Sequence, residues 1–138
     1  MFIFKLDGAQ IKEFMQKLLR EEVFDGWEVR SVHVQNFMAF DITGACEWGR
    51  LRPYVFNIIS GNQRPSLLKI ILALPQSEWE KVHPNGSSFF LNINFDGEEL
   101  LCTTATSEKV FTMDKTVDAA WDNYVKMFMA ENQIYSSL

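Results

Sequence analysis

Apolar and polar side chains alternate along residues 88–96. From residue 89 to residue 95 every second residue is Phe, Leu or Ile. A period of two is typical of a β-strand that buries one face. Asp96-Gly97 then favours a tight turn, because glycine adopts the positive φ that such turns need. The pattern predicts a hairpin with residues 100–106 in which Ile93 faces Leu100, and we expect this hairpin to form the middle of a sheet.

Three other stretches repeat their apolar residues at helical spacing. Residues 11–19, 51–59 and 117–128 carry apolar side chains at intervals of three and four residues, which places them on one face. Each stretch is predicted to be a helix whose apolar face packs on the sheet, and Tyr54 belongs to the stripe of the second. Asp7 precedes the first helix, and its carboxylate is expected to cap the free amides of the first turn.

The remaining apolar stretches predict strands. Residues 2–6, 27–34 and 36–42 have strand patterns, and the last two are joined by a tight reversal. Residues 67–74 are apolar at almost every position, which is typical of a strand covered on both faces. Residues 44–49 have glycine at both ends and are predicted to be a loop.

The predicted elements follow the order β-α-β-β-α-β-β-β-α in a single globular domain, residues 1–138. Residues 110–112 are expected to add a short edge strand after the hairpin. This order predicts an α+β fold with a mainly antiparallel sheet and helices largely on one face.

The composition supports a packed core. Of the 138 residues, 47% are hydrophobic, including 12 Phe and 4 Trp, which argues against a disordered chain. Two cysteines are too few for a disulfide scaffold. The N-terminal sequence lacks the features of a signal peptide, and no apolar run approaches the ~20 residues of a membrane-spanning helix. We therefore expect a cytoplasmic protein without membrane contact.

Charge is distributed unevenly along the chain. The formal net charge of −5 argues against a general nucleic-acid binder. Residues 48–77 contain four basic side chains and no Asp or Glu, whereas the rest of the chain has 9 basic and 18 acidic residues. The alternative explanation is that this span is mostly buried, which excludes acids. The candidate contacts to an anion or a nucleic acid are Lys17, Arg20, Arg50, Arg52, Arg64 and Lys69.

No set of residues points to catalysis, a metal ion or a cofactor. Nucleophilic catalysis needs a nucleophile, a base and a group that orients the base. The chain offers only His33, His83, Cys46 and Cys102 for these roles, and none has the spacing of paired zinc ligands. His33 is expected in a strand and Cys102 in the buried hairpin. Cys46, in the predicted loop, is the more accessible thiol, so a pair of Cys46 and a histidine is the enzymatic alternative.

Three segments carry a resemblance to a known family: LRPYVFNIISGN, FFLNINFDGEELLCTTATS and VFTMDKTVDAAWDNYVKMF. On these segments the chain resembles an uncharacterised family of small bacterial proteins, a domain of unknown function. The resemblance is expected to cover nearly the whole chain. It implies a single domain, and it brings no activity, ligand or site residue with it.

The element order is also similar to that of DNA sliding-clamp domains, which contain paired α/β units. The equal apolar stripes that start at Ile11 and Leu51 suit such a pseudo-repeat, although the first unit is one strand short of the second. The helices of clamps face DNA and carry basic residues, so this resemblance implies DNA contacts by Lys17, Arg20 and Arg50. Likeness of fold does not by itself establish function.

Three functional hypotheses follow from these observations. The first is a non-enzymatic binding or protein-interaction module, whose partner is another protein or a second copy of the chain. It rests on the many apolar residues, the opposed charge regions and the lack of a catalytic set. The second hypothesis is a clamp-like nucleic-acid-associated protein, and the third is a small enzyme that uses Cys46 or a histidine. We expect a binding module rather than an enzyme.

Overall fold

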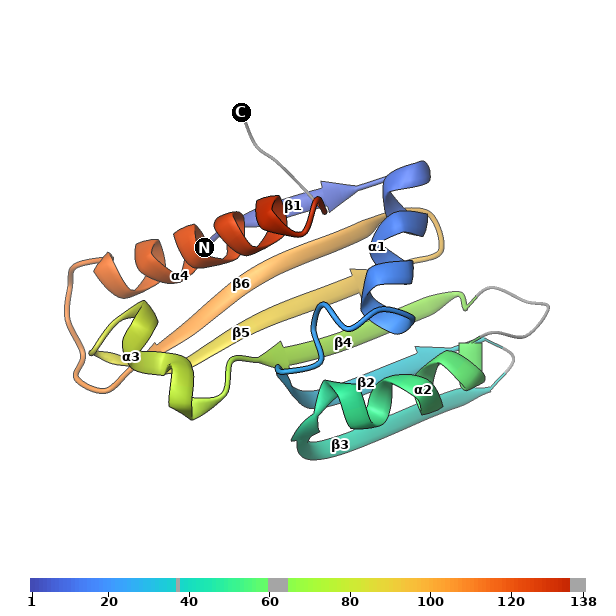
Figure 1. Ribbon diagram of the computed structural model, residues 1–138, viewed down its shortest axis with the longest axis horizontal. Helices are drawn as coiled ribbons and strands as arrows, with labels where there is room; N and C mark the ends of the chain where they lie inside the picture. The colour runs from blue at the N-terminus through green and yellow to red at the C-terminus, as the bar shows by residue number, and fades with distance from the viewer. Residues whose placement is uncertain (37, 60–64, 135–138) are drawn as a thin grey trace.

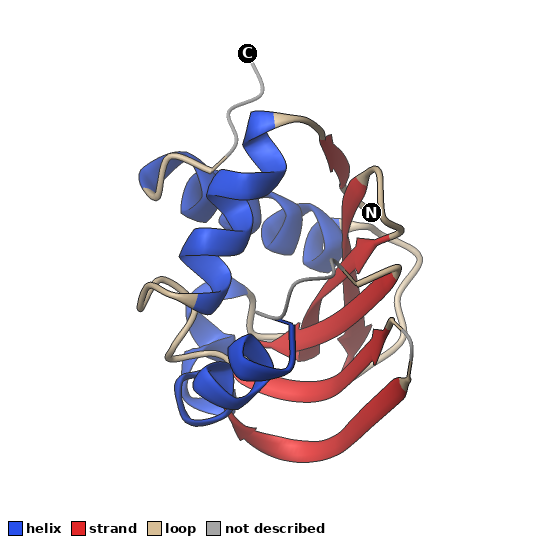
Figure 2. Ribbon diagram, turned by 90° about the vertical axis from the view of Figure 1, so that its right-hand side faces the viewer, coloured by secondary structure: helices blue, strands red, loops and turns tan. Residues whose placement is uncertain are grey.

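The computed structural model describes residues 1–36, 38–59 and 65–134, which form one sheet with helices on one side of it (Figures 1 and 2). The strands are β1 (Ile3–Leu6), β2 (Glu28–Gln35), β3 (Ala39–Glu47), β4 (Leu67–Ala73), β5 (Gly86–Phe95) and β6 (Leu100–Glu108). The helical elements are α1 (Ala9–Leu19), α2 (Trp48–Ile59), the short turns η1 (Gln76–Glu78) and α3 (Trp79–Val82), and α4 (Thr116–Glu131). The predicted α+β class and the predicted order of strands and helices are confirmed.

The six strands lie in the order β1-β6-β5-β4-β2-β3, and every neighbouring pair is antiparallel. Side chains that alternate toward the helices form the core, for example Leu68, Ile70 and Leu72 of β4. The expectation that this strand is covered on both faces is wrong. Lys69, between the buried residues, is exposed on the face away from the helices, and we call this side of the sheet the open face.

The central hairpin has a longer turn than the sequence predicts. Ile93 pairs with Cys102 rather than with Leu100, so residues 96–99 form a four-residue connection. The Asp96 carboxylate accepts hydrogen bonds from the N–H groups of Glu98 and Glu99 (2.9 and 2.8 Å), and these bonds hold the pKa of Asp96 below its usual range. The side chain therefore stabilises a wider turn. The register moves by two residues, so each side chain keeps its predicted face.

Residues 44–49 are not a loop. β3 continues to Glu47 by pairing with β2, and α2 starts directly at Trp48. The Trp48 side chain is fully buried, and its indole Nε1 donates to the carbonyl oxygen of Leu18 (2.8 Å). This buried anchor, together with the strand pairing, outweighs the local preference of the glycines for a loop.

Two smaller predictions are also wrong. Gly8, at φ 54°, is the N-cap of α1 and makes no side-chain cap bond, so the Asp7 carboxylate does not cap the helix. Residues 110–112 do not form a strand. The side chain of Asn85 takes up the hydrogen-bonding groups of the Val110 backbone that a strand would use for pairing. The Asn85 amide donates to the Val110 carbonyl (3.0 Å), and its oxygen accepts from the Val110 N–H (3.1 Å).

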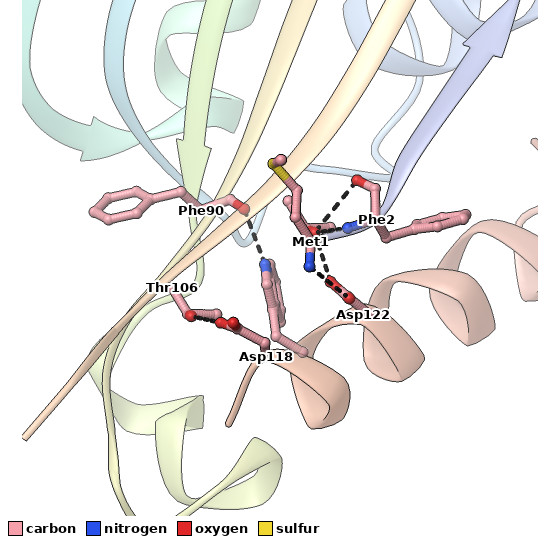
Figure 3. Close-up of polar contacts among 8 residues, drawn as sticks. Met1, Phe2, Phe90, Thr106, Asp118 and Asp122 are labelled. Atoms are coloured by element: carbon pink, nitrogen blue, oxygen red, sulfur yellow. Dashed lines mark hydrogen bonds and ion pairs between the residues drawn. The ribbon is translucent and has the colours of Figure 1, made fainter. Parts of the chain in front are cut away.

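Helix α4 is fixed to the sheet by polar contacts around a buried tryptophan (Figure 3). The indole of Trp121 donates to the carbonyl oxygen of Phe90 (2.9 Å), and the hydroxyl of Thr106 donates to Asp118. Asp122 accepts from Thr104 (2.5 Å) and makes an ion pair with the Met1 amino group (3.3 Å). These contacts attach α4 to β5, to β6 and to the start of β1.

Candidate interaction surface along the edge of the sheet

The two edge strands of the sheet are built differently. β1 has four residues, and its Lys5 makes an ion pair with Glu99 (3.4 Å). Short edge strands that carry a lysine resist pairing with another chain. β3 has nine residues without lysine, arginine or proline, and all of them except Phe40 and Ile42 are exposed. The β1 edge is therefore protected, whereas the β3 edge is open (Figure 1).

Only part of β3 is regular enough to pair with another strand. Its register with β2 is unbroken over residues 39–43 and shifts beyond the pair of Thr43 with Ser31. Gly44 follows with φ 129°, a conformation that other residues rarely adopt. Such irregularities bend a strand and disrupt its ladder. We call the regular part, residues 39–43, the free edge.

The helix side of the free edge is apolar and hollowed. A hollow of about 350 Å³ is lined by Cys46, Arg50, Leu51 and Tyr54. A second hollow of about 230 Å³ adjoins it and is lined in part by Ile42 and Leu51. We call the two together the helix-side hollow. Tyr54 is 67% exposed, so an aromatic ring stands at the rim of this hollow rather than in the core.

The open face beside the free edge carries several polar side chains. A hollow of about 250 Å³ lies over β3, β2, β4 and β5. Asp41, His33, Lys69 and Asn94 stand in register across these four strands. His33 Nδ1 lies 2.5 Å from Asp41 Oδ1, yet the Asp41 side chain is 67% exposed. Asn94 Oδ1 is buried and has no hydrogen-bond partner within the described residues. A segment paired with β3 would therefore meet a carboxylate on this side.

Two of the predicted anion contacts are engaged within the protein. Arg52 donates through Nε and a terminal nitrogen to the two carboxylate oxygens of Asp25 (2.8 and 2.9 Å). The hydrogen bond to this carboxylate raises the pKa of Arg52. The guanidinium of Arg20 lies over the ring of Phe56, 5.6 Å from its centroid. Arg20 thus links the end of α1 to α2, and Arg52 links α2 to the connection between α1 and β2.

The other predicted anion contacts do not gather in one place. Lys17 lies on α1 beside Glu13 and Glu21. Arg50 is exposed in the first turn of α2, and Lys69 is exposed on the open face, on the other side of the sheet from both helices. Arg64 lies outside the described residues. Anion binding by any of these residues stays a prediction.

The residues considered for catalysis are also apart. Cys46 lies near the end of β3 beside α2, whereas His33 lies on the open face. Cys102 is buried, and burial raises the pKa of its thiol. His83 accepts a hydrogen bond within its own turn. In the part of the chain that the structure describes, no three His, Cys, Asp or Glu side chains are placed to hold a metal ion.

A further exposed apolar surface lies in the loop between β6 and α4. Val110, Phe111 and Met113 are 70%, 82% and 84% exposed. Asn85 fixes this loop through its two bonds to Val110, and Thr112 donates its N–H to Glu108 (3.1 Å). The loop is a second candidate contact surface, but the structure shows no complementary feature that would define a partner.

Sequence reasoning missed the free edge and its rim. Tyr54 falls in the apolar stripe of α2, yet it is exposed because α2 covers the last two strands of the sheet and the sheet ends there (Figure 1). Asp41 was placed in a strand, but nothing in the sequence marked that strand as an edge.

The comparison with family models gives one match. A model described as a family of unknown function (DUF5721) matches residues 45–136, two thirds of the chain. The chain belongs to this family. The predicted resemblance to a domain of unknown function is thus confirmed, although the DUF5721 match leaves out residues 1–44. The free edge precedes the matched region, whereas Arg50, Leu51 and Tyr54 lie inside it.

The other comparisons add no relative. No curated protein and no solved structure matches the chain. No helix within the described ranges is long and apolar enough to cross a membrane.

Proposed function

We propose that this DUF5721 protein is a protein-interaction module that binds an extended segment of a partner chain by adding it to the sheet beside β3. One observation carries the proposal: the sheet has a protected edge at β1 and an unprotected one at β3. In strand addition the main chain of the partner supplies hydrogen bonds, and the pockets beside the edge select side chains. The free edge has hollows on both of its sides, as this mode of binding requires.

The energetics indicate that side chains must contribute to such binding. In an antiparallel ladder, every second residue of the free edge directs its N–H and C=O groups outward. These groups give about five hydrogen bonds to an added strand. At roughly 0.5–1.5 kcal/mol each, these amount to about 2.5–7.5 kcal/mol. Association of two molecules costs about 4–15 kcal/mol. The main chain alone therefore gives weak binding at best, and the flanking hollows decide which segment binds.

The alternative functions have less support. A clamp-like contact to DNA needs basic side chains that gather on the helices, but Arg20 lies over the ring of Phe56 and Lys17 lies beside two acidic side chains. An enzyme that uses Cys46 needs a base beside it, and the described residues place His33 on the other side of the sheet. No observation favours either alternative over the β3 edge.

Peptide selection tests the proposal. Ten-residue peptides are selected from a phage-displayed random library on the immobilised protein and then synthesised. We expect bound peptides to slow hydrogen exchange of outward-facing amides in residues 39–43. The amides of β1 (Ile3–Leu6) serve as the control and should not change.

N-methylation of the selected peptides gives a matched control. Methylation of alternate residues removes the N–H groups of one edge of the peptide and keeps all of its side chains. One set of methylated positions should weaken binding at least tenfold, and the other set should have little effect. The proposal is wrong if no peptide binds, if protection falls outside β3, or if both sets act equally.

A further inference from the structure

The structure also indicates the chemistry of the segment that the β3 edge binds, an inference that rests on the proposed function. Successive side chains of a paired strand point to opposite faces of the sheet. A segment added beside β3 therefore directs one set of side chains to the helix side and the alternate set to the open face. The two sides of the free edge differ in polarity, so the two sets must differ as well.

On the helix side the receiving surface is apolar. Ile42 of the free edge, Leu51 and Tyr54 contribute most of its apolar side chains, and the hollow of about 350 Å³ between α2 and β3 is wide enough for an aliphatic or aromatic side chain. A polar side chain placed there would exchange water for mainly aliphatic and aromatic surface, apart from the exposed Arg50 at the border of the larger hollow. The positions that face the helix side should therefore be apolar.

On the open face the receiving charge is negative. Asp41 is the one charged side chain among residues 39–43. It contacts His33 through Oδ1 and remains 67% exposed, so a cation can approach its carboxylate. Beyond His33, whose Nδ1 lies against Asp41 Oδ1, the next basic side chain in this row is Lys69 on β4, two strands from β3. Strands are about 4.8 Å apart, so Lys69 lies about 14 Å from an added strand. This exceeds the Debye length of about 8 Å at physiological ionic strength, so Lys69 opposes a cation only weakly there.

A second copy of the chain fits the free edge less well than a different segment does. A two-fold antiparallel pair centred on Asp41 sets two carboxylates directly opposite each other, which is unfavourable. A two-fold pair of β3 strands centred on Ile42 keeps the helix sides of both copies on the same side of the joined sheet. It brings Gly44, with its irregular backbone, opposite Phe40. Only three regular residue pairs then remain, so the free edge is suited to a foreign strand.

We infer that the partner of the β3 edge is an extended segment in which apolar residues alternate with lysine or arginine. Apolar side chains at alternate positions enter the helix-side hollow between Leu51 and Tyr54. The intervening basic side chains lie along the open face, where one of them contacts Asp41. Such a segment contacts the helix-side hollow and Asp41 at the same time.

Three synthetic decapeptides test the inference: one that alternates Val and Lys, one that alternates Val and Glu, and a scrambled peptide of the Val–Lys composition. We expect the first to bind at least tenfold more tightly than the other two at low salt, with an affinity that falls as salt rises. Asp41→Asn keeps the oxygen near His33 but removes the charge, and should weaken binding of the Val–Lys peptide about fivefold or more. Tyr54→Ser should weaken all alternating peptides.

Two control variants change exposed side chains that lie away from the β3 edge. Glu80→Gln removes an exposed charge from α3, and Met127→Ser removes an exposed apolar side chain from α4; neither should change binding. If library peptides pair with β3 without this alternation, or if Asp41→Asn has no effect, the inference is wrong and the proposed function stands. A stable dimer in sedimentation velocity that Thr43→Lys dissociates identifies a second copy as the partner, which also overturns the inference. If no peptide of any kind binds β3, both proposals fail.

Discussion

The two cysteines show how strongly the surroundings of a residue set its chemistry. Cys46 is exposed on an edge strand, and Cys102 on β6 is fully buried in the core. Removal from water disfavours the thiolate, so the pKa of Cys102 is raised. Because the thiolate is the reactive form, only one of the two cysteines has access to reagents in the folded protein.

We predict that a thiol reagent such as DTNB modifies one cysteine of the native protein rapidly at pH 8, and the second only after unfolding. Raising the pH to 9 should leave Cys102 protected, because burial raises the pKa of its thiol and keeps it protonated. Cys46→Ser should remove the fast phase, and Cys102→Ser should retain it. Two fast phases in the wild type would show that the core around β6 opens readily.

At the scale of elements, the position of α2 depends on an ion pair that the sequence did not reveal. Asp25 lies before β2 and Arg52 in the first half of α2, 27 residues later. Their side chains are 28% and 17% exposed and form two parallel hydrogen bonds. Bidentate pairs of this kind fix geometry as well as charge. The pair therefore holds α2 against the connection that leads into β2.

We predict that Arg52→Met destabilises the protein by about 1.5–3 kcal/mol, the range for hydrogen bonds to charged groups. Arg52→Lys should recover little of this loss, because an ammonium cannot make the two parallel bonds. Arg50→Met, on the same helix but exposed, is the control and should change stability by less than about 0.5 kcal/mol. The measurement is urea unfolding followed by tryptophan fluorescence; equal midpoints for Arg52→Met and Arg50→Met would contradict the prediction.

Elements were predictable where the periodic pattern of apolar residues agreed with the face that the element buries in the fold. The stripes of α1 and α4 and the alternation of β5 specify a face, and each of these elements forms as expected. Two of the failures came from groups that act at a distance. The Trp48 indole donates to the carbonyl of Leu18, and α2 begins at Trp48, inside the stretch predicted to be a loop. The Asn85 side chain bonds the backbone of Val110, in the stretch predicted to be an edge strand. Such contacts join residues about 25 to 30 positions apart, so no local pattern reports them.

The candidate site was less predictable than the fold, for the same reason. An edge is a property of strand order, and strand order depends on which partners the neighbouring strands choose. The sequence placed Asp41 in a strand and Tyr54 on a helical stripe, both correctly. It could not show that β3 ends the sheet, which is the fact that exposes both side chains.

At the scale of the whole molecule, an aromatic cluster connects the helical layer to the sheet. The ring of Trp121 lies 5.7 Å from Trp27, 5.3 Å from Phe89 and 5.4 Å from Tyr124, between centroids. These residues come from α4, from β5 and from the segment that enters β2. One side chain of α4 thus contacts two other parts of the fold that are far apart in sequence.

We predict that Trp121→Ala lowers the free energy of unfolding by about 3–5 kcal/mol, the usual cost of truncating a buried tryptophan. Met127→Ala on the same helix, where the side chain is 55% exposed, should cost less than about 0.5 kcal/mol. Trp121→Phe should fall between them, because it keeps part of the ring volume but loses the bond to the Phe90 carbonyl. An unchanged melting temperature for Trp121→Ala would show that α4 is not packed on the sheet in solution.

The place of β1 has a consequence for the order of events during synthesis. β1 pairs only with β6, and the Phe2 N–H donates to the hydroxyl of Thr104, 102 residues later. At about 5–20 residues per second, a ribosome needs roughly 5–20 s to make the intervening chain. Through this interval Phe4 and Leu6 have no strand to pair with, and the apolar stripe of α1 lacks most of the sheet it will cover. The strand that leaves the ribosome first is therefore among the last to find its place, and the nascent chain should depend on chaperones most during that wait.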